Sequence, residues 1–391
     1  MATRRAFLRA AAIGGAYLLS GGLRAASADP LRAIQARLND YTSRALANSS
    51  AKVAVVAGVV TPEINGGTGE ILYAGGAQLT NPFGEPLSLD ERTPFEIGSI
   101  SKVFSSGICY MLHGPYSGTL GSHMPAMGMS RGVADLTLVN LAIYQPGLAQ
   151  DNQGGVYPRW ILENLETLFR YLSRYDPPYP QGSCYAYSNL GWSLLAMAAL
   201  GLDSRQPGTL PGLYAGALAD FCSRFAATET RIFDPGLKPL LPRGHRKDMQ
   251  ALPARASYRP TEWPHVGAGG VISTGADMMQ FLLYNMGQLP GGVGDPALAY
   301  QQTRTFEAHS CASTGSPITS YGWFHAPHRT AAGRTMVLSK NGGVAGYSSW
   351  MGFKQWQGTG VPSSHGLFVL SNGHDSTKLG KELMRKLLLA G

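Results

Sequence analysis

The segment Phe95-Glu-Ile-Gly-Ser-Ile-Ser-Lys-Val-Phe104 contains a serine and a lysine three positions apart, Ser99 and Lys102. Apolar residues recur at helical spacing through and beyond this segment, at Ile100, Val103, Phe104, Ile108 and Met111. On a helix, a spacing of three residues places both side chains on one face. A serine hydroxyl needs a neighbouring base before it can attack a carbonyl group. The segment therefore predicts a nucleophile, Ser99, beside a base, Lys102. A second Ser-x-x-Lys, Ser49–Lys52, precedes an expected strand instead of a helix, and we set it aside.

A second polar stretch, Tyr187-Ser188-Asn189, precedes a helical pattern that begins at Leu190. A phenol beside a lysine ammonium group loses its proton more readily, which suits proton transfer to and from a serine. The Asn189 amide can both donate and accept hydrogen bonds with a substrate amide. The alternative interpretation is an ordinary helix cap, in which Ser188 or Asn189 accepts from free backbone N–H groups.

A third stretch, Lys340-Asn341-Gly342-Gly343, ends the apolar run 336–339. Lys340 offers a cation for a substrate carboxylate, and the backbone N–H groups of the following residues can bind an oxyanion. The alternative interpretation is a hairpin turn at Asn341-Gly342, because Asn-Gly is a strong hairpin signal.

These three stretches, in this order, resemble the class C β-lactamase-like family of penicillin-recognising serine hydrolases. That family carries Ser-x-x-Lys, Tyr-x-Asn and Lys-Thr-Gly. Further similarity lies at 136–141, 186–190, 267–279 and 321–323, so the resemblance spans nearly all of the chain after residue 28. Within the family, the sequence is most similar to the AmpH-type D-alanyl-D-alanine carboxypeptidase/endopeptidases.

The resemblance implies a role for each residue. Ser99 would be the nucleophile, Lys102 its proton acceptor, and Tyr187 the group that carries the proton to the leaving group. Asn189 would hold the substrate amide, and Lys340 would orient Tyr187 and the substrate carboxylate.

The resemblance also implies an oxyanion hole formed by the main-chain N–H groups of Ser99 and Gly343. The implied fold is α/β (α+β): an antiparallel sheet of five or more strands flanked by helices, with an inserted, mostly helical lobe. The site would lie in the cleft between the two parts, and the first and last helices would pack together on the sheet.

Two positions depart from the family pattern. Asn341 stands where the family usually has Thr, so the contact to the substrate carboxylate is expected to differ. Tyr144-Gln-Pro-Gly-Leu148 stands where many relatives have His-Thr-Ser-Gly-Leu, in a loop expected near the cleft.

The apolar pattern of the rest of the chain agrees with this fold. We expect helices at 29–47, 136–143, 160–171, 190–200, 214–225 and 378–389. We expect strands at 52–60, 70–77, 321–325, 335–339, 347–353 and 366–370. Early and late strands with a helical middle predict a sheet lobe (29–113 plus 265–391) interrupted by a helical lobe (114–264).

The N-terminus has the pattern of an export signal. Two arginines, Arg4-Arg5, precede a mildly apolar run, and Ala26-Ser27-Ala28 offers a small-x-small cleavage site. Residues 1–28 are therefore predicted to be a twin-arginine signal peptide that directs the protein to the periplasm. An ordinary secretory signal is the alternative. No later run reaches the roughly 20 apolar residues of a membrane span.

The chain's charge is modest. Its formal net charge is +8 in 391 residues, and half of it comes from the four arginines of residues 1–28. No Lys/Arg run that would indicate nucleic-acid binding remains after that segment. The expected partners are peptidoglycan peptides or β-lactams as substrates, with no nucleic acid.

The four cysteines are widely spaced, so a C-x-x-C metal site is not expected, and one or two disulfides are compatible with export. We predict Cys109 as a buried small apolar residue. There is no H-E-x-x-H motif and no His/Asp cluster with metal spacing, so we predict neither a metal nor a cofactor.

Three other signals are set aside. Gly128-Met-Ser130-Arg-Gly132 matches a nucleophile elbow, but the Gly/Pro-rich stretch before it cannot form the required strand. His265 and Asp277 could complete a triad, yet Asp277 fits the start of a helix better. His245 is expected at the surface.

The sequence thus predicts an exported serine hydrolase with an acyl-Ser99 intermediate. The first expectation is a D-alanyl-D-alanine carboxypeptidase/endopeptidase that also binds or hydrolyses β-lactams. A family esterase, a β-lactamase and a catalytically silent penicillin-binding-like sensor are the alternatives.

Overall fold

The computed structural model describes residues 30–390, apart from 49–52, 77, 152–156, 159–163, 203–208, 249, 254–263, 291, 304, 313, 331–332, 345 and 356–359. The predicted signal peptide and the second Ser-x-x-Lys, Ser49–Lys52, lie outside the described residues. No described helix is both long enough and apolar enough to cross a membrane.

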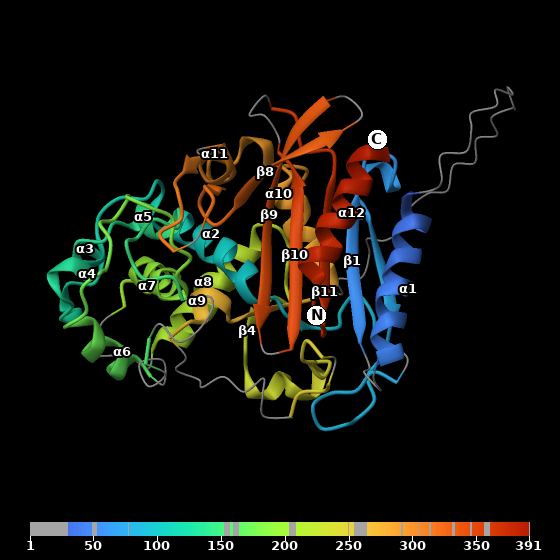
Figure 1. Ribbon diagram of the computed structural model, residues 1–391, viewed down its shortest axis with the longest axis horizontal. Coiled ribbons are helices and arrows are strands. Elements are labelled where there is room, and N and C mark those ends of the chain that lie inside the picture. Colours follow the sequence, from blue (N-terminus) through green and yellow to red (C-terminus); the bar gives the residue numbers. More distant parts are fainter. Residues whose placement is uncertain are drawn as a thin grey trace, which may run out of the picture.

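An eight-stranded antiparallel sheet, in the order β2-β1-β11-β10-β9-β8-β7-β6, is the centre of the fold (Figure 1). Its strands are β1 (Ala54–Val60), β2 (Glu70–Gly75), β6 (Phe306–Glu307), β7 (Ile318–Thr319), β8 (Phe324–Thr330), β9 (Gly333–Val344), β10 (Tyr347–Lys354) and β11 (Gly366–Ser371). The predicted antiparallel sheet is thus confirmed. Strand β1 is buried along its whole length, and its alternate residues face two different apolar clusters.

One face of the sheet is covered by the first and last helices, α1 (Pro30–Asn48) and α12 (Ser376–Ala390), which lie together on it as predicted (Figure 1). Leu379 and Leu383 of α12 are buried in the same apolar cluster as Leu38 of α1. The Arg37 guanidinium donates to both oxygens of the Glu382 carboxylate, at distances of 2.9 to 3.1 Å, and so links the two helices.

The other face carries α10 (Gly275–Asn285), and α2 (Ser101–His113) packs against α10. A 3₁₀ turn, Gly98–Ile100, leads into α2. The rings of Phe104 and Phe281 stack with centroids 3.9 Å apart and join these two helices. A small sheet in the order β3-β5-β4 lies beside them, formed by Phe95–Glu96, Val271–Ser273 and Arg231–Ile232.

Helices gather at the opposite end of the molecule from α1 (Figure 1). The further helices are α3 (Leu120–His123), α4 (Arg131–Ala134), α5 (Leu138–Ala142), α6 (Leu165–Leu172), α7 (Asn189–Ala199), α8 (Leu210–Ser223), α9 (Val266–Gly269) and α11 (Pro296–Thr303). Further 3₁₀ turns lie at Asn65–Gly67, Pro125–Met127, Pro235–Leu240 and Gly292–Gly294. Residues Leu190 to Ala199 of α7 are all buried, so this helix is the core of the helical region. The division into lobes at 114–264 stays a prediction.

Three sequence interpretations are wrong. The strand expected at 321–325 begins only at Phe324, because the chain bends at Gly322, which has a φ of 94°. Asn341-Gly342 forms no hairpin turn, since β9 continues to Val344. His245 is 2% exposed, and its Nδ1 lies 3.0 Å from the Asn372 carbonyl oxygen.

The signals that were set aside have structural roles. The Ser130 hydroxyl caps α4 and donates to the Tyr175 carbonyl oxygen. Asp277 lies in the first turn of α10, as predicted, and accepts from the backbone N–H groups of Thr228 and Glu229.

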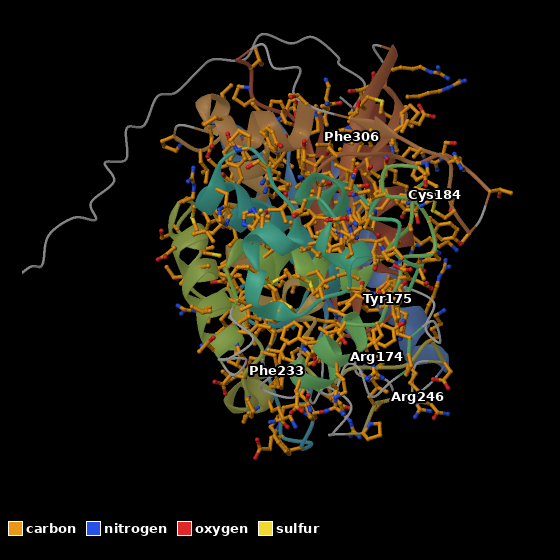
Figure 2. The ribbon with its side chains drawn as sticks, turned by 90° about the vertical axis from the view of Figure 1, so that its left-hand side faces the viewer. Arg174, Tyr175, Cys184, Phe233, Arg246 and Phe306 are labelled. Carbon is orange, nitrogen blue, oxygen red and sulfur yellow. A yellow bond between two sulfur atoms is a disulfide. The ribbon has the colours of Figure 1, made fainter. Side chains whose placement is uncertain are left out.

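The cysteines divide into one disulfide and two buried thiols. Cys184 is bonded to Cys311, which joins segments 127 residues apart (Figure 2). Cys109 and Cys222 are free and buried, and for Cys109 this confirms the prediction.

Candidate active site

The Ser99 turn is held tightly against β9. Gly98 has a φ of 51°, and a Cβ atom there would lie 2.7 Å from the backbone nitrogen of Gly343. A Cβ on Gly342 would lie 2.0 Å from the Ile97 carbonyl oxygen. Only glycine permits both the left-handed backbone and the close approach at position 98. The two glycines therefore bring the backbone of Ser99 beside that of Gly343.

Lys102 projects from the first turn of α2 into a fully buried position. Its Nζ lies 3.0 Å from Ser99 Oγ, 2.8 Å from Asn189 Oδ1 and 2.6 Å from the Ala268 carbonyl oxygen. The two carbonyl-type oxygens can only accept hydrogen bonds, whereas a hydroxyl can also donate. A neutral amine satisfies all three neighbours when its two N–H groups point to the carbonyl oxygens and its lone pair faces the serine hydroxyl.

The electrostatics favour that neutral amine. Burial lowers the pKa of Lys102 well below its ordinary value, and the positive charge of Lys340 lowers it further. The Asp151 carboxylate acts in the opposite direction and raises the Lys102 pKa. A lysine whose pKa is lowered in this way can accept the serine proton.

The Tyr187-Ser188-Asn189 stretch opens α7, and both interpretations of it hold. Ser188 Oγ accepts from the Gly191 backbone N–H at 3.0 Å, which makes it the helix cap. Asn189 at the same time contacts Lys102 through its side-chain oxygen. The cap thus fixes the orientation of a residue in the site.

Tyr187 lies between the two lysines. The Lys340 Nζ is 3.4 Å from its hydroxyl oxygen, and the Nζ atoms of Lys102 and Lys340 are 5.1 and 5.3 Å from its ring centroid. Burial raises the pKa of Tyr187, and a hydrogen bond with Ser99 only partly offsets this. The expectation of an easily deprotonated phenol is therefore wrong for this resting site. Tyr187 is neutral and can act as a proton donor.

Lys340 is buried on β9, and burial lowers its pKa to about 7. Its Nζ donates to the Asn341 carbonyl oxygen at 2.7 Å. The pairing of β9 with β8 stops at the Phe324–Ser339 pair, so β8 leaves the edge of β9 from Lys340 onward uncovered. Asn341 is exposed at this edge.

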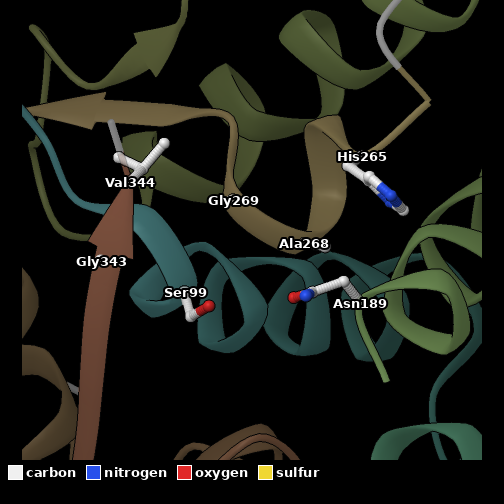
Figure 3. Close-up of a pocket in the computed structure, with 7 residues that line it drawn as sticks. All are labelled: Ser99, Asn189, His265, Ala268, Gly269, Gly343 and Val344. Carbon is white, nitrogen blue, oxygen red and sulfur yellow. The ribbon is translucent and has the colours of Figure 1, made fainter. Parts of the chain in front are cut away.

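A pocket of about 150 Å³ opens between these elements (Figure 3). It is lined by Ser99, Asn189, His265, Ala268, Gly269, Gly343 and Val344. Figure 3 shows the Ser99 hydroxyl and the Asn189 amide pointing toward each other, from the 3₁₀ turn before α2 and from the start of α7. Lys102 and Tyr187 contact this group directly. The structure thus brings the predicted site residues together, while the Asn341 side chain is exposed at the margin.

Sequence reasoning missed Asp151. Its carboxylate accepts from the backbone N–H groups of Asn189 at 2.6 Å and Leu190 at 2.9 Å. The available signal was its position three residues after the Tyr144–Leu148 loop, which the sequence placed near the cleft.

Sequence reasoning considered His265 only as a triad partner. His265 lines the pocket, and its Nδ1 is hydrogen-bonded to the Ser193 hydroxyl of α7. Asp277 is bonded to Thr228, Glu229 and Thr230 instead. The two residues are therefore engaged with different partners.

Comparisons with known proteins agree on one family. The Beta-lactamase family model matches residues 63–391. The D-alanyl-D-alanine-carboxypeptidase/endopeptidase AmpH of Escherichia coli K12 is 27% identical over 224 residues, which are 55% of this chain and 54% of that protein. The chain thus spans about half the length of this curated relative.

Solved structures show the same fold. The D-alanine carboxypeptidase AmpC of Burkholderia cenocepacia superposes with a TM-score of 0.66 at 18% identity, covering 92% of this chain and 99% of that one. A class C beta-lactamase in complex with cefoxitin gives a TM-score of 0.68 at 18% identity, covering 91% and 98%.

Proposed function

The chain belongs to the beta-lactamase family, and we propose that it is a serine acyl hydrolase that forms an acyl intermediate on Ser99. Its proposed substrates are D-alanyl-D-alanine peptides of peptidoglycan, cleaved as a carboxypeptidase or endopeptidase, and it also reacts with β-lactams. The observation that carries the proposal is the arrangement around Lys102, whose two carbonyl neighbours leave its lone pair for the Ser99 hydroxyl. The similarity to AmpH supports the choice of substrate.

In the first step, Ser99 Oγ attacks the scissile carbonyl carbon while Lys102 Nζ takes the hydroxyl proton. The carbonyl oxygen becomes negative and is stabilised by the backbone N–H groups of Ser99 and Gly343. The C–N bond then breaks, and the neutral Tyr187 phenol protonates the leaving amine. The proton held by Lys102 returns to Tyr187, so the acyl-enzyme forms with no net loss of protons.

In the second step, water attacks the ester carbon and Lys102 Nζ accepts its proton. The bond from carbon to Ser99 Oγ then breaks, Lys102 returns the proton to Ser99 Oγ, and the acid product leaves with Ser99 restored. Asn189 holds the acyl amide through these steps, because its side-chain amide faces the pocket. Lys340 attracts the free carboxylate of a peptide C-terminus or a β-lactam.

Intact-mass measurement on the mature protein from Asp29, incubated with a penicillin, tests this function. A lasting adduct on the wild type and none on Ser99→Ala would support a peptidase with an acyl-Ser99 intermediate. Rapid penicillin loss without a lasting adduct, abolished in Ser99→Ala, would place β-lactam hydrolysis ahead of peptide cleavage. Neither adduct nor turnover would overturn the proposal and favour a silent sensor or an esterase.

An esterase of the same family is the second candidate, and Asn341 is the observation that favours it. Asn341 stands where the family usually has Thr, at the exposed edge of β9. Hydrolysis of simple esters that exceeds cleavage of carboxylate-terminated peptides would identify the esterase.

We further propose that residues 1–28 direct twin-arginine export to the periplasm, and the Cys184–Cys311 disulfide supports an oxidising compartment. Replacing Arg4 and Arg5 with lysine in the full chain should retain the protein in the cytoplasmic fraction. Unchanged export would argue for an ordinary secretory signal.

A further inference from the structure

A second, larger hollow adjoins the Ser99 pocket. Its volume is about 530 Å³, and it shares Gly343 and Val344 with the pocket. We call it the basic groove; its lining is Arg246, Lys247, Leu252, Gly343, Val344, Gly346, Tyr347, Ser348 and His374. A ligand bound to the backbone at Gly343 can therefore continue from the pocket into the groove.

Arg246 and Lys247, the two basic residues with exposed side chains at this groove, belong to segment 243–252, which the structure describes apart from residue 249. Its arms are joined by a hydrogen bond from the Arg246 backbone N–H to the Gln250 carbonyl oxygen at 2.8 Å. The His245 backbone N–H lies 3.1 Å from the Gly346 carbonyl oxygen, which fixes the segment to the turn after β9. These backbone hydrogen bonds fix the main chain at Arg246 and Lys247 relative to the sheet.

The contacts that attach this segment to the sheet are buried. Asn372 donates through its side-chain amide to the Arg243 carbonyl oxygen at 2.8 Å, and Tyr347 donates to the Pro242 carbonyl oxygen. The Leu252 side chain fills the space above Gly346, where a Cβ atom would lie 2.4 Å from Leu252 Cδ1. The segment packs as part of the fold.

The groove is positively charged. Arg246 and Lys247 are exposed, and neither forms an ion pair with any residue that the structure describes. Figure 2 shows Arg246 at the surface of the molecule. The His374 side chain also lines the groove. No Asp or Glu is among the described lining residues. The nearby Asp248 carboxylate accepts from the Gln250 backbone N–H.

The direction of β9 assigns the groove to one side of the substrate. Lys340, proposed to attract the carboxylate of the leaving residue, comes first along the strand, Gly343 of the proposed oxyanion hole comes next, and the groove follows from Val344. The leaving group thus lies toward Lys340 and the acyl chain toward the groove. The groove begins at Gly343 itself. An extended peptide advances about 3.3 Å per residue, so the second and third residues on the acyl side of the scissile bond can reach into the groove.

We propose that the basic groove binds a second carboxylate, carried by the acyl part of the peptide two or three residues before the scissile bond. This inference rests on the proposed peptidase function and narrows its substrates to acidic peptides. A bidentate guanidinium–carboxylate pair between Arg246 and the peptide is the chemistry that the groove offers.

Matched peptides test the groove. Each ends in D-Ala-D-Ala and carries either Glu or Gln at the second or third acyl-side residue, and kcat/KM is measured for both. We expect the wild type to prefer the Glu peptide by about tenfold, mainly through KM, and to lose this preference as salt rises. The variant Arg246→Gln/Lys247→Gln should treat the two peptides alike, because its kcat/KM for the Glu peptide should fall to the level of the Gln peptide.

A control variant, Lys381→Gln/Arg385→Gln, removes the same charge from exposed positions on α12 and should keep the preference. Equal turnover of both peptides by the wild type would overturn the groove assignment and leave the peptidase function standing. If neither peptide is cleaved, the peptidase function fails and the groove assignment fails with it; penicillin acylation of Ser99, measured in parallel, shows whether the nucleophile itself works.

Discussion

The carboxylate of Asp151 accepts a 2.6 Å hydrogen bond from the backbone N–H of Asn189. This contact ties the loop after Tyr144–Leu148 to the start of α7, at the residue whose side chain contacts Lys102. Asp151 therefore affects the proposed base in two ways: it positions Asn189, and its negative charge raises the Lys102 pKa.

Replacing Asp151 with Asn should change both effects. Loss of the charge lowers the pKa of Lys102, so the acid limb of the kcat/KM profile should move to lower pH. Loss of the hydrogen bonds to α7 should reduce kcat/KM by roughly 10- to 100-fold, because small displacements of positioning groups are costly. Asp135→Asn, a matched change at an exposed acid, should do neither. A smaller kcat/KM with an unshifted pH profile would assign Asp151 a purely structural role.

Replacing Lys340 with Met should shift the same acid limb in the opposite direction. The positive charge of Lys340 lowers the Lys102 pKa, so its removal should raise that pKa and move the limb to higher pH. Because the Lys340 pKa is about 7, the difference from the wild type should be largest below pH 7. KM for a peptide with a free C-terminal carboxylate should also rise, while KM for its C-terminal amide should not. Parallel increases for both peptides would exclude Lys340 as the carboxylate site.

The sequence predicted the parts of the site that come from local patterns. The three-residue spacing of Ser99 and Lys102 is enough to predict that their side chains lie on one side of a helical turn. The apolar pattern after Asn189 is enough to predict that the Tyr187–Asn189 stretch opens a helix. Asp151 could not be identified in this way, because its bonds to Asn189 and Leu190 span 38 and 39 residues.

Burial was the other property that sequence patterns did not reveal. His245 lies in a run of charged residues, yet contacts with Asn372 bury it. Tyr187 lies beside Lys340, yet burial raises the pKa of the phenol. Both errors arise because the packing of distant segments decides solvation, which a local pattern does not contain.

Removing the disulfide should destabilise the segment that leads into Tyr187. Cys184 lies three residues before Tyr187, and Cys184→Ser/Cys311→Ser removes a bond that closes a 127-residue separation. We expect the free energy of unfolding to fall by about 2–4 kcal/mol. Thermal unfolding with and without dithiothreitol checks this: the reductant should lower the Tm of the wild type and leave that of the variant unchanged. An equal Tm for both proteins without reductant would contradict the expectation.

Gly98→Ala should damage the site more than it damages the fold. The new Cβ would lie 2.7 Å from the Gly343 nitrogen and push the Ser99 turn away from β9, so penicillin acylation should slow by at least tenfold. Gly128→Ala separates this contact from backbone strain, since Gly128 has a similar φ of 60° but no atom within 4 Å of the added Cβ. Both variants should lose about 1–2 kcal/mol of unfolding free energy to the left-handed backbone, yet only Gly98→Ala should acylate slowly. Equal acylation rates in the two variants would show that the close approach of Ser99 to Gly343 is not needed for the reaction.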